Sequence, residues 1–333
     1  MKTHKHLGLV LNNTLTWDNH INKICLEAGK RISNIKRLPN NITPFTKLHI
    51  YKTFIRPVLE YGSVIFDNCS KALSDDLESS QRQAAIAATR AYNHTTHANL
   101  LQECGLQTLQ TRRQMAKVVL FFKIKKGKAP EYLQGLLPEE VQENTDYNLR
   151  NSQDIRLPKI SKNYFLKSFI PSSIHAWNKL SENIRNIAEV DTFKATLSKI
   201  YEKVECYKPY LQGRSNGHVH LSRMRMKLSG LNAHRKKHHF IDFKSCPNCT
   251  ADTEDEIHFF LSCTDYAALR LDLLAQLRRL LPQHTNLINH LETRRNQKLL
   301  IQIILCGIGN EDTDIEIFDI TALFISNTKR FEW

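Results

Sequence analysis

Hydrophobic residues recur at spacings of three and four over the first third of the chain, which is the period of an amphipathic α-helix. One such run begins at Asp18. Another follows Thr43-Pro44, a pair typical of a helix start because threonine caps the first turn and proline needs no hydrogen-bond donor there. Pro57 lies inside the second run and is expected to kink it. The pattern predicts consecutive helices over residues 18–36, 44–59, 73–88, 97–104 and 109–126, which together form an all-α unit to about residue 128.

The pattern changes on both sides of these helices. Residues 5–11 form a short apolar run before Asn12-Asn13, a turn signal, and predict a single β-strand whose sheet partners lie elsewhere. Between residues 127 and 187, prolines at intervals exclude long helices. We expect an irregular connector there, with extended pieces at 155–160 and 164–169 and a short helix around Trp177. Helical periodicity returns at Phe193, so the predicted fold class is mainly α.

The composition is that of a soluble globular protein. A chain of 333 residues, 41% hydrophobic and 24% charged, is long enough for about two domains and is not of the disordered or low-complexity class. Its longest strongly apolar stretch, residues 299–308, is about half of what a membrane span requires, and the N-terminal residues lack the pattern of a secretory signal. We therefore expect an intracellular protein, nuclear or cytoplasmic, that is not secreted.

The net charge of +14 makes polyanions the natural partners. Residues 207–244 contain nine Lys and Arg and one Asp, a net charge of +8, and apolar residues within them predict a helix with one apolar and one basic face. The candidate phosphate contacts in this segment are Arg223, Arg225, Lys227, Arg235, Lys236 and Lys237. A solvated helix surface or a localisation signal is the alternative explanation.

The most specific chemical pattern is C-x2-C-x8-H-x4-C, formed by Cys246, Cys249, His258 and Cys263. Zinc prefers four thiolate or imidazole ligands at tetrahedral corners, and two cysteines three residues apart on a tight turn supply two of them. The protein fills all four positions, so the predicted zinc is structural rather than catalytic. The other five cysteines are scattered singly, which argues against a disulfide framework; chance clustering of reduced thiols is the alternative to a metal site.

No catalytic constellation accompanies this pattern. Nucleotidyl transfer needs carboxylates that hold two metal ions roughly 4 Å apart. The adjacent aspartates Asp75 and Asp76 instead fall in the first turn of a predicted helix, where they compensate the helix dipole. A nuclease that uses His and Cys at a metal is disfavoured because the metal site is closed. The residues by themselves indicate a zinc-stabilised, basic, mostly helical binding module.

A colinear series of motifs extends over nearly the whole chain. It comprises KHLGLVL at 5–11, LTWDNHI at 15–21, AGKR at 28–31, YKTFIRPVLEYG at 51–62, QRQAA at 81–85, GLQTLQTRR at 105–113, FKI at 122–124, SFIP at 168–171, WNKL at 177–180 and LNAH at 231–234, followed by the Cys/His cluster with Tyr266 and Arg270. The series resembles the C-terminal part of the jockey-like non-LTR retrotransposon reverse transcriptases.

The resemblance implies a linear order of regions. These are a remnant of the last palm strand at 1–17, a helical thumb-like domain at 18–128, a connector at 129–190, a basic zinc-binding region at 191–290 and a C-terminal helical segment at 291–333. It also implies that the palm carboxylates that bind magnesium belong before residue 1, so we expect nucleic-acid binding without polymerisation by this chain alone. Magnesium is expected only for that missing domain.

By this resemblance alone, the candidate contacts to a template-primer duplex are Arg31, Arg82, Arg112 and Arg113. The implied partners are the element's RNA or DNA, and an intact reverse transcriptase is a further candidate. The alternative function is a domesticated or stand-alone protein-interaction module in which the zinc is purely structural.

Overall fold

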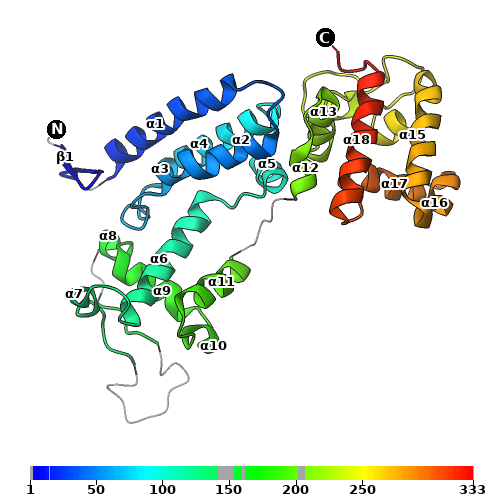
Figure 1. Cartoon of the computed structure of the whole chain (residues 1–333). Helices are drawn as coiled ribbons and strands as arrows, with labels where there is room; N and C mark the ends of the chain where they lie inside the picture. Colours follow the sequence, from blue (N-terminus) through cyan, green and yellow to red (C-terminus); the bar gives the residue numbers. More distant parts are fainter. Residues whose placement is uncertain (1–2, 15, 142–153, 160–161, 202–206, 333) are drawn as a thin grey trace. The chain divides into compact units, whose positions relative to one another are not determined.

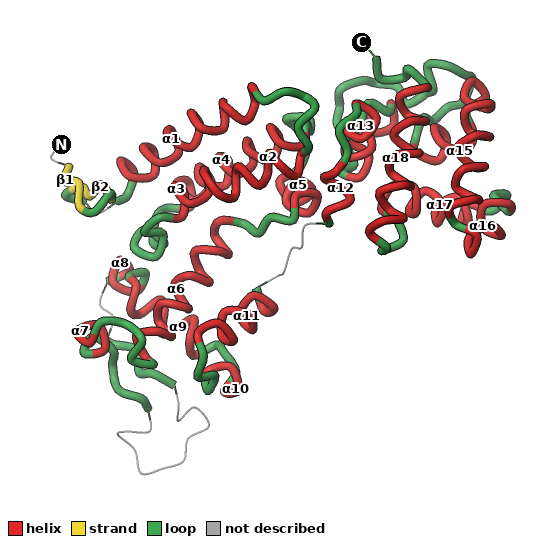
Figure 2. The backbone as a smooth tube through the Cα atoms, viewed as in Figure 1, coloured by secondary structure: helices red, strands yellow, loops and turns green. Residues whose placement is uncertain are grey.

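The computed structural model describes residues 3–14, 16–141, 154–159, 162–201 and 207–332. These residues are mainly helical, with one two-stranded antiparallel sheet, so the predicted fold class is confirmed (Figures 1 and 2). No helix among them is long and apolar enough to cross a membrane. The chain divides into two compact units. The first comprises Met1–Lys30, Ile55–Gln81 and Gln107–Val204, and the second comprises Arg31–Phe54, Arg82–Leu106 and Glu205–Trp333. Neither unit is one continuous stretch of sequence.

The single strand predicted at residues 5–11 is wrong, because this segment folds as a hairpin. β1 (Thr3–His6) pairs antiparallel with β2 (Leu9–Asn12). The chain reverses at Leu7 and Gly8, whose φ angles of 43° and 88° are both positive, as a two-residue hairpin turn requires. Leu7 continues the apolar run in the sequence although it occupies a turn position. The hydroxyl of Tyr61 donates to the Leu7 carbonyl at 2.9 Å and helps to hold this turn.

The helices predicted in the first third of the chain are present. Their bounds are α1 (Asp18–Arg37), α2 (Pro44–Ile50), η1 (Tyr51–Ile55), α3 (Arg56–Glu60), α4 (Lys71–Thr89), α5 (His97–Cys104) and α6 (Leu109–Lys125). Thr43 caps α2 by accepting a hydrogen bond from the Thr46 amide at 3.2 Å. The expected kink takes the form of the π-helical segment η1, which precedes Pro57 because proline supplies no amide for the carbonyl four residues earlier.

Among its described residues, the segment predicted as an irregular connector contains four short helices separated by non-helical stretches: α7 (Glu131–Gln134), α8 (Asn163–Leu166), α9 (Phe169–Asn178) and α10 (Glu182–Arg185). α11 (Val190–Ile200) follows the connector, where helical periodicity was predicted to return at Phe193. The short helix predicted around Trp177 is confirmed as α9. The extended piece predicted at 164–169 is wrong, since it contributes to α8 and α9. Of the other predicted piece, Ile155 forms an isolated antiparallel bridge with Glu140, while Ile160 lies outside the described residues, as does Leu15 of the N-terminal motif.

An aromatic cluster holds this part of the first unit together. Phe121 and Phe122 on α6, Trp177 on α9 and Phe193 on α11 are completely buried. The rings of Phe122 and Phe193 stack with their centroids 4.1 Å apart. The packing of α9 and α11 against α6 is visible in Figure 1 and follows from this cluster.

The second unit is built around α18 (Glu311–Asn327). Helices α12 (Lys208–Gln212), α13 (Asn216–Arg225), α15 (Ala267–Leu280) and α17 (Arg294–Cys306) pack against it (Figure 1). The unit also contains α14 (Asn232–Lys237), η3 (His258–Ser262), η4 (Thr264–Tyr266), η5 (Pro282–His284) and α16 (Thr285–Asn289). From the first third of the chain it includes α2, α5 and the C-terminal ends of α1 and α4. Gly217 permits the close approach of α13 to α18, because a Cβ there would overlap the backbone of Ala322.

Candidate metal centre

The four predicted metal ligands converge in the second unit. The Sγ atoms of Cys246 and Cys263 lie 3.9 Å apart, and the Sγ of Cys249 lies 3.4 Å from Nε2 of His258. All four ligand atoms lie within 4.8 Å of one another. A tetrahedral zinc ion with Zn–S of about 2.3 Å and Zn–N of about 2.0 Å places its ligand atoms roughly 3.5–3.8 Å apart. The cluster could therefore hold a metal ion such as zinc.

Backbone hydrogen bonds form the loop that carries the first two cysteines. The amide of Cys246 donates to the carbonyl of Ala251 at 2.9 Å, which closes a tight turn around Cys249. The amide of Glu254 donates to the carbonyl of Lys244 at 2.7 Å and pins the two ends of the loop. These bonds keep both thiols on the same side of the loop.

A π-helical turn brings the other two ligands together. His258 begins η3 and Cys263 follows it, and the amide of Cys263 donates to the His258 carbonyl at 2.8 Å. Because this hydrogen bond spans five residues rather than four, residues five apart come to lie on the same side. Asp255 accepts a hydrogen bond from the His258 amide at 2.8 Å, and Arg270 donates to the Cys263 carbonyl at 2.9 and 3.0 Å. The sequence spacing of the ligands gave no sign of this widening.

The four ligand side chains differ in acidity. Burial raises the pKa of Cys246, and it raises the pKa of Cys263 to about 12. The pKa of the Cys249 thiol is lowered, mainly by a hydrogen bond from the backbone amide of Ala251. Burial lowers the pKa of His258, which favours the neutral ring that coordinates a metal ion. A metal ion bound here would have to displace protons from the buried thiols.

The N-terminal end of α14, a basic helix, is hydrogen-bonded to both ends of the metal-binding loop. The side-chain amide of Asn232 donates to the Ser245 carbonyl at 2.7 Å, and the Ala233 amide donates to the Glu254 carbonyl at 3.1 Å. Ser245 and Glu254 flank the two loop cysteines in the sequence. The position of α14 therefore depends on the conformation of the loop.

The loop is also tied to the end of the chain by a buried ion pair that the sequence did not reveal. The Glu254 side chain is 1% exposed, and the Arg330 guanidinium donates to its two oxygens at 2.7 and 2.8 Å. Glu254 also accepts a hydrogen bond from the Asn232 amide at 2.8 Å. No spacing rule could have found this pair, because 76 residues separate its members.

Two residues predicted on the basic face of the helix, Arg223 and Arg225 of α13, point into the second unit instead. The side chain of Arg225 is 5% exposed, pairs with Glu103 at 2.7 Å and lies 4.1 Å from the ring centroid of Tyr210. Arg223 donates to the Arg90 carbonyl at 2.8 and 3.1 Å. Both guanidinium groups point into the unit because a buried carboxylate and a backbone carbonyl from distant segments meet them there.

The other four predicted contacts of the basic segment lie at the surface of the second unit. The side chain of Lys227 is 59% exposed and reaches Glu256 at 3.4 Å. Arg235 is half-buried, and Lys236 and Lys237 are exposed at the end of α14. Nucleic-acid contact by these four residues stays a prediction.

Two of the four arginines expected at a template-primer duplex bind backbone carbonyls of the second unit. Arg31 donates to the carbonyl of Phe54 at 2.6 Å. Arg82 donates to the carbonyls of Asn93 and Thr95, the latter at 2.9 Å. These bonds give both residues a structural task, and their role at a duplex stays a prediction.

The other two, Arg112 and Arg113, belong to the first unit and bind carboxylates there. Arg112 forms an ion pair with Glu60. Arg113 is buried, with 2% of its side chain exposed, and lies 3.6 Å from Asp67 and 2.7 Å from the hydroxyl of Ser74. The structure does not bring these two arginines together with Arg31 and Arg82 in one unit.

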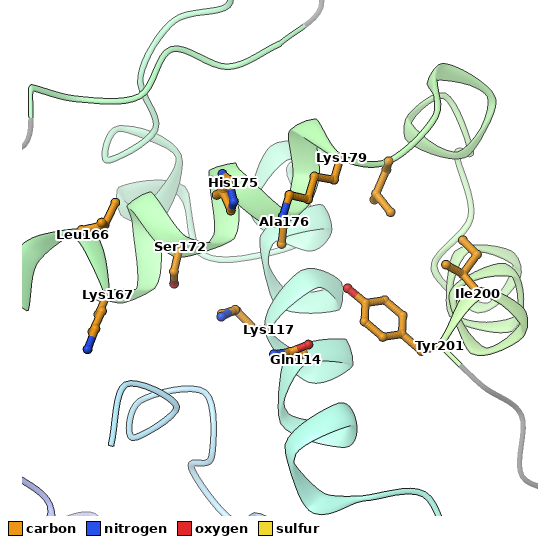
Figure 3. A pocket seen from close by; sticks show the side chains of 11 residues that line it. Gln114, Lys117, Leu166, Lys167, Ser172, His175, Ala176, Lys179, Ile200 and Tyr201 are labelled. Carbon is orange, nitrogen blue, oxygen red and sulfur yellow. The ribbon is translucent and has the colours of Figure 1, made fainter. Parts of the chain in front are cut away.

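A positively charged pocket lies in the first unit. It has a volume of about 510 Å³ and is lined from α6, α9 and the residues next to α8 and α11, including Lys117, Lys167, His175, Lys179 and Tyr201 (Figure 3). Burial raises the pKa of Tyr201. The pocket belongs to a different unit from the metal centre and so forms no part of that site.

No family model, curated protein or solved structure matches this chain. The resemblance to reverse transcriptases therefore stays an expectation from the sequence motifs.

Proposed function

We propose that this chain is the nucleic-acid-binding C-terminal portion of a non-LTR retrotransposon RNA-directed DNA polymerase, in which a structural zinc ion orders the binding surface. The single observation that carries the proposal is the attachment of α14 to the metal-binding loop. The hydrogen bonds of Asn232 and Ala233 to that loop link the position of Lys236 and Lys237 to the metal centre.

The ligand set favours zinc with a structural role. Three thiolates and one imidazole are ligands that zinc accepts readily, and four protein ligands leave no open position for a reacting water. In the proposed function the metal therefore acts on folding alone, and the exposed cations of α14 act on the nucleic acid. Phosphate groups bind to such cations with release of counterions, without regard to base sequence.

The experiment measures the affinity of the full chain for RNA and DNA oligonucleotides against salt concentration. Each phosphate contact contributes a slope of about −0.7 to −0.9 to the plot of log affinity against log salt. The double substitution Lys236→Gln and Lys237→Gln should make the slope shallower by about 1.4 to 1.8 and leave the metal content unchanged. The matched control is the double substitution Arg295→Gln and Lys298→Gln. It neutralises two exposed cations on α17 and should leave the slope as it was.

A second function, a protein-interaction module with a structural metal, is favoured by the internal positions of Arg223 and Arg225. These residues carry part of the charge that suggested a nucleic-acid partner, yet they bind Glu103 and the Arg90 carbonyl. A shallow salt slope of the unmodified chain, or one that does not respond to the α14 substitutions, would support this second function.

We also expect no template-dependent primer extension by this chain. Polymerisation needs carboxylates that hold two metal ions. The sequence has one pair of adjacent aspartates, and Asp75 of that pair binds Lys71 on the exposed face of α4.

A further inference from the structure

A pocket in the second unit has aromatic walls next to the basic helix α14. Its volume is about 510 Å³, and it is lined by Tyr92, His94, Phe240, Arg235 and the segment 228–230. Tyr92 is 37% exposed and Phe240 is 45% exposed. Large aromatic side chains this exposed gain little from the core of the protein, and their exposed surface can contact a ligand.

The first wall of the pocket is held rigidly. The Arg223 guanidinium lies over the ring of Tyr92, 4.0 Å from its centroid, and also binds the Arg90 carbonyl. Arg82 donates to the carbonyls of Asn93 and Thr95. These bonds fix the loop that carries Tyr92 and His94, so the wall exists before any ligand binds.

A second wall of the pocket, formed by Phe240, is fixed by the end of α14. The Phe240 amide donates to the Arg235 carbonyl at 3.0 Å, and the His239 amide donates to the Lys236 carbonyl at 2.9 Å. With His239 at a φ of 59°, this is the arrangement of a Schellman motif. It places Phe240 just after the C-terminal end of α14, the end at which Lys236 and Lys237 are exposed. The Phe240 ring lies 5.1 Å from that of His94, at an interplanar angle of 60°.

We propose that this pocket takes an unpaired base of single-stranded RNA or DNA, which stacks on Phe240 while Lys236 and Lys237 bind the phosphates beside it. The inference rests on the proposed function and specifies its ligand. Aromatic platforms beside exposed cations are how proteins hold single strands, since every base has a face that can stack. A base inside a duplex is already stacked and paired, and it would have to leave the duplex to enter the pocket.

The test compares 12-nucleotide single strands of RNA and of DNA with the corresponding duplexes, using the full chain loaded with zinc. Phe240→Ala should weaken single-strand binding roughly ten-fold and change duplex binding less than about two-fold. The salt slope should not change, because no phosphate contact is removed. Phe240→Trp should keep the affinity. The matched control is Phe243→Ala, which removes a neighbouring aromatic ring that is 55% exposed and does not line the pocket.

The outcomes separate the pocket from the proposed function. If Phe240→Ala and Phe243→Ala bind the single strand with equal affinity, the pocket does not bind a base, while the proposed function still stands. The proposal of an unpaired base in the pocket would also fail if the chain bound duplexes as tightly as single strands and Phe240→Ala weakened both equally. Failure of the unmodified chain to bind any oligonucleotide would overturn both. A difference between the RNA and DNA arms would show which strand the pocket prefers.

Discussion

The aromatic cluster on α6, α9 and α11 and the metal-binding loop hold their shapes in different ways. In the cluster, rings such as those of Phe122 and Trp177 are completely buried, and contacts between these apolar side chains hold three helices together. In the loop, most residues from Ile241 to Thr253 are at least partly exposed, and Phe243 points into solvent. The loop is held by the buried ion pair of Glu254 with Arg330, and its cluster of three Cys and one His could hold a metal ion as a second anchor.

This difference shows where each part of the molecule is vulnerable. A segment with little apolar area to bury cannot offset the entropy of ordering its backbone. It depends on a few strong, specific contacts, whereas the aromatic cluster distributes its stability over many weak ones. The function proposed for α14 depends on the metal-binding loop, and loss of a bound metal ion would disorder that loop.

Removal of the metal should have the largest effect. We expect one zinc ion per chain, and we expect Cys249→Ser with Cys263→Ser to abolish its retention, because the binding free energy of a structural zinc, about 10 kcal/mol or more, is also folding free energy. Amide hydrogen exchange should then become fast over residues 244–264 and stay slow in α6. A zinc stoichiometry near zero in the unmodified chain, with slow exchange in the loop, would show that the loop orders without a metal.

Truncation in the aromatic cluster should come next. Trp177→Ala should lower the free energy of unfolding by about 3–5 kcal/mol, because it leaves a large cavity among Phe121, Phe122 and Phe193. Urea unfolding measures this loss, and the zinc content should not change. The matched control is Tyr164→Ala on α8, which removes an aromatic ring that is 70% exposed and should cost less than about 0.5 kcal/mol. Loss of zinc from the Trp177→Ala protein would mean that the two regions are not independent.

Loss of the buried carboxylate should have an effect of similar or slightly smaller size. Glu254→Gln leaves the charge of Arg330 buried without its partner, so we expect a loss of about 3 kcal/mol in the free energy of unfolding. Faster hydrogen exchange should appear first in the metal-binding loop. Asp75→Asn breaks an exposed ion pair with Lys71 and serves as the control, with an expected loss below about 0.5 kcal/mol. Equal effects of the two substitutions would contradict the role given to burial.

The smallest effect should appear in acid. Burial, with contributions from Arg223 and Arg90, lowers the pKa of His220 to about 4, against about 6.5 in the unfolded chain. This difference in pKa contributes fully to the free energy of unfolding above pH 6.5. The contribution, about 2 kcal/mol after allowance for partial exposure, is lost as the pH falls from 6.5 to 4. His220→Phe keeps the ring that stacks on Phe331 and should remove this part of the acid sensitivity. Unfolding curves of both proteins at pH 7 and pH 4.5 measure it, and parallel losses in the two would contradict the assignment.

The sequence alone predicted the features that depend on neighbouring residues. Thr43 caps α2, α5 spans His97–Cys104 as predicted and is followed by Gly105 with a φ of 57°, and the four metal ligands converge as their spacing indicated. Each of these follows from contacts within a few residues or from a ligand geometry that restricts the spacing. The error at Leu7 is also local, because an apolar residue at a turn position looks like part of a strand.

Only the tertiary structure decided which charged residues remain at the surface. Arg225 and Lys227 are two residues apart in a basic run, yet the first is buried against Glu103, 122 residues away, and the second is exposed. Whether a charge is buried depends on whether the fold brings it a carboxylate, and hydrophobic periodicity carries no information about partners so distant in the sequence. The same holds for the pocket of Tyr92 and Phe240, whose walls come from segments more than a hundred residues apart that both belong to the second unit.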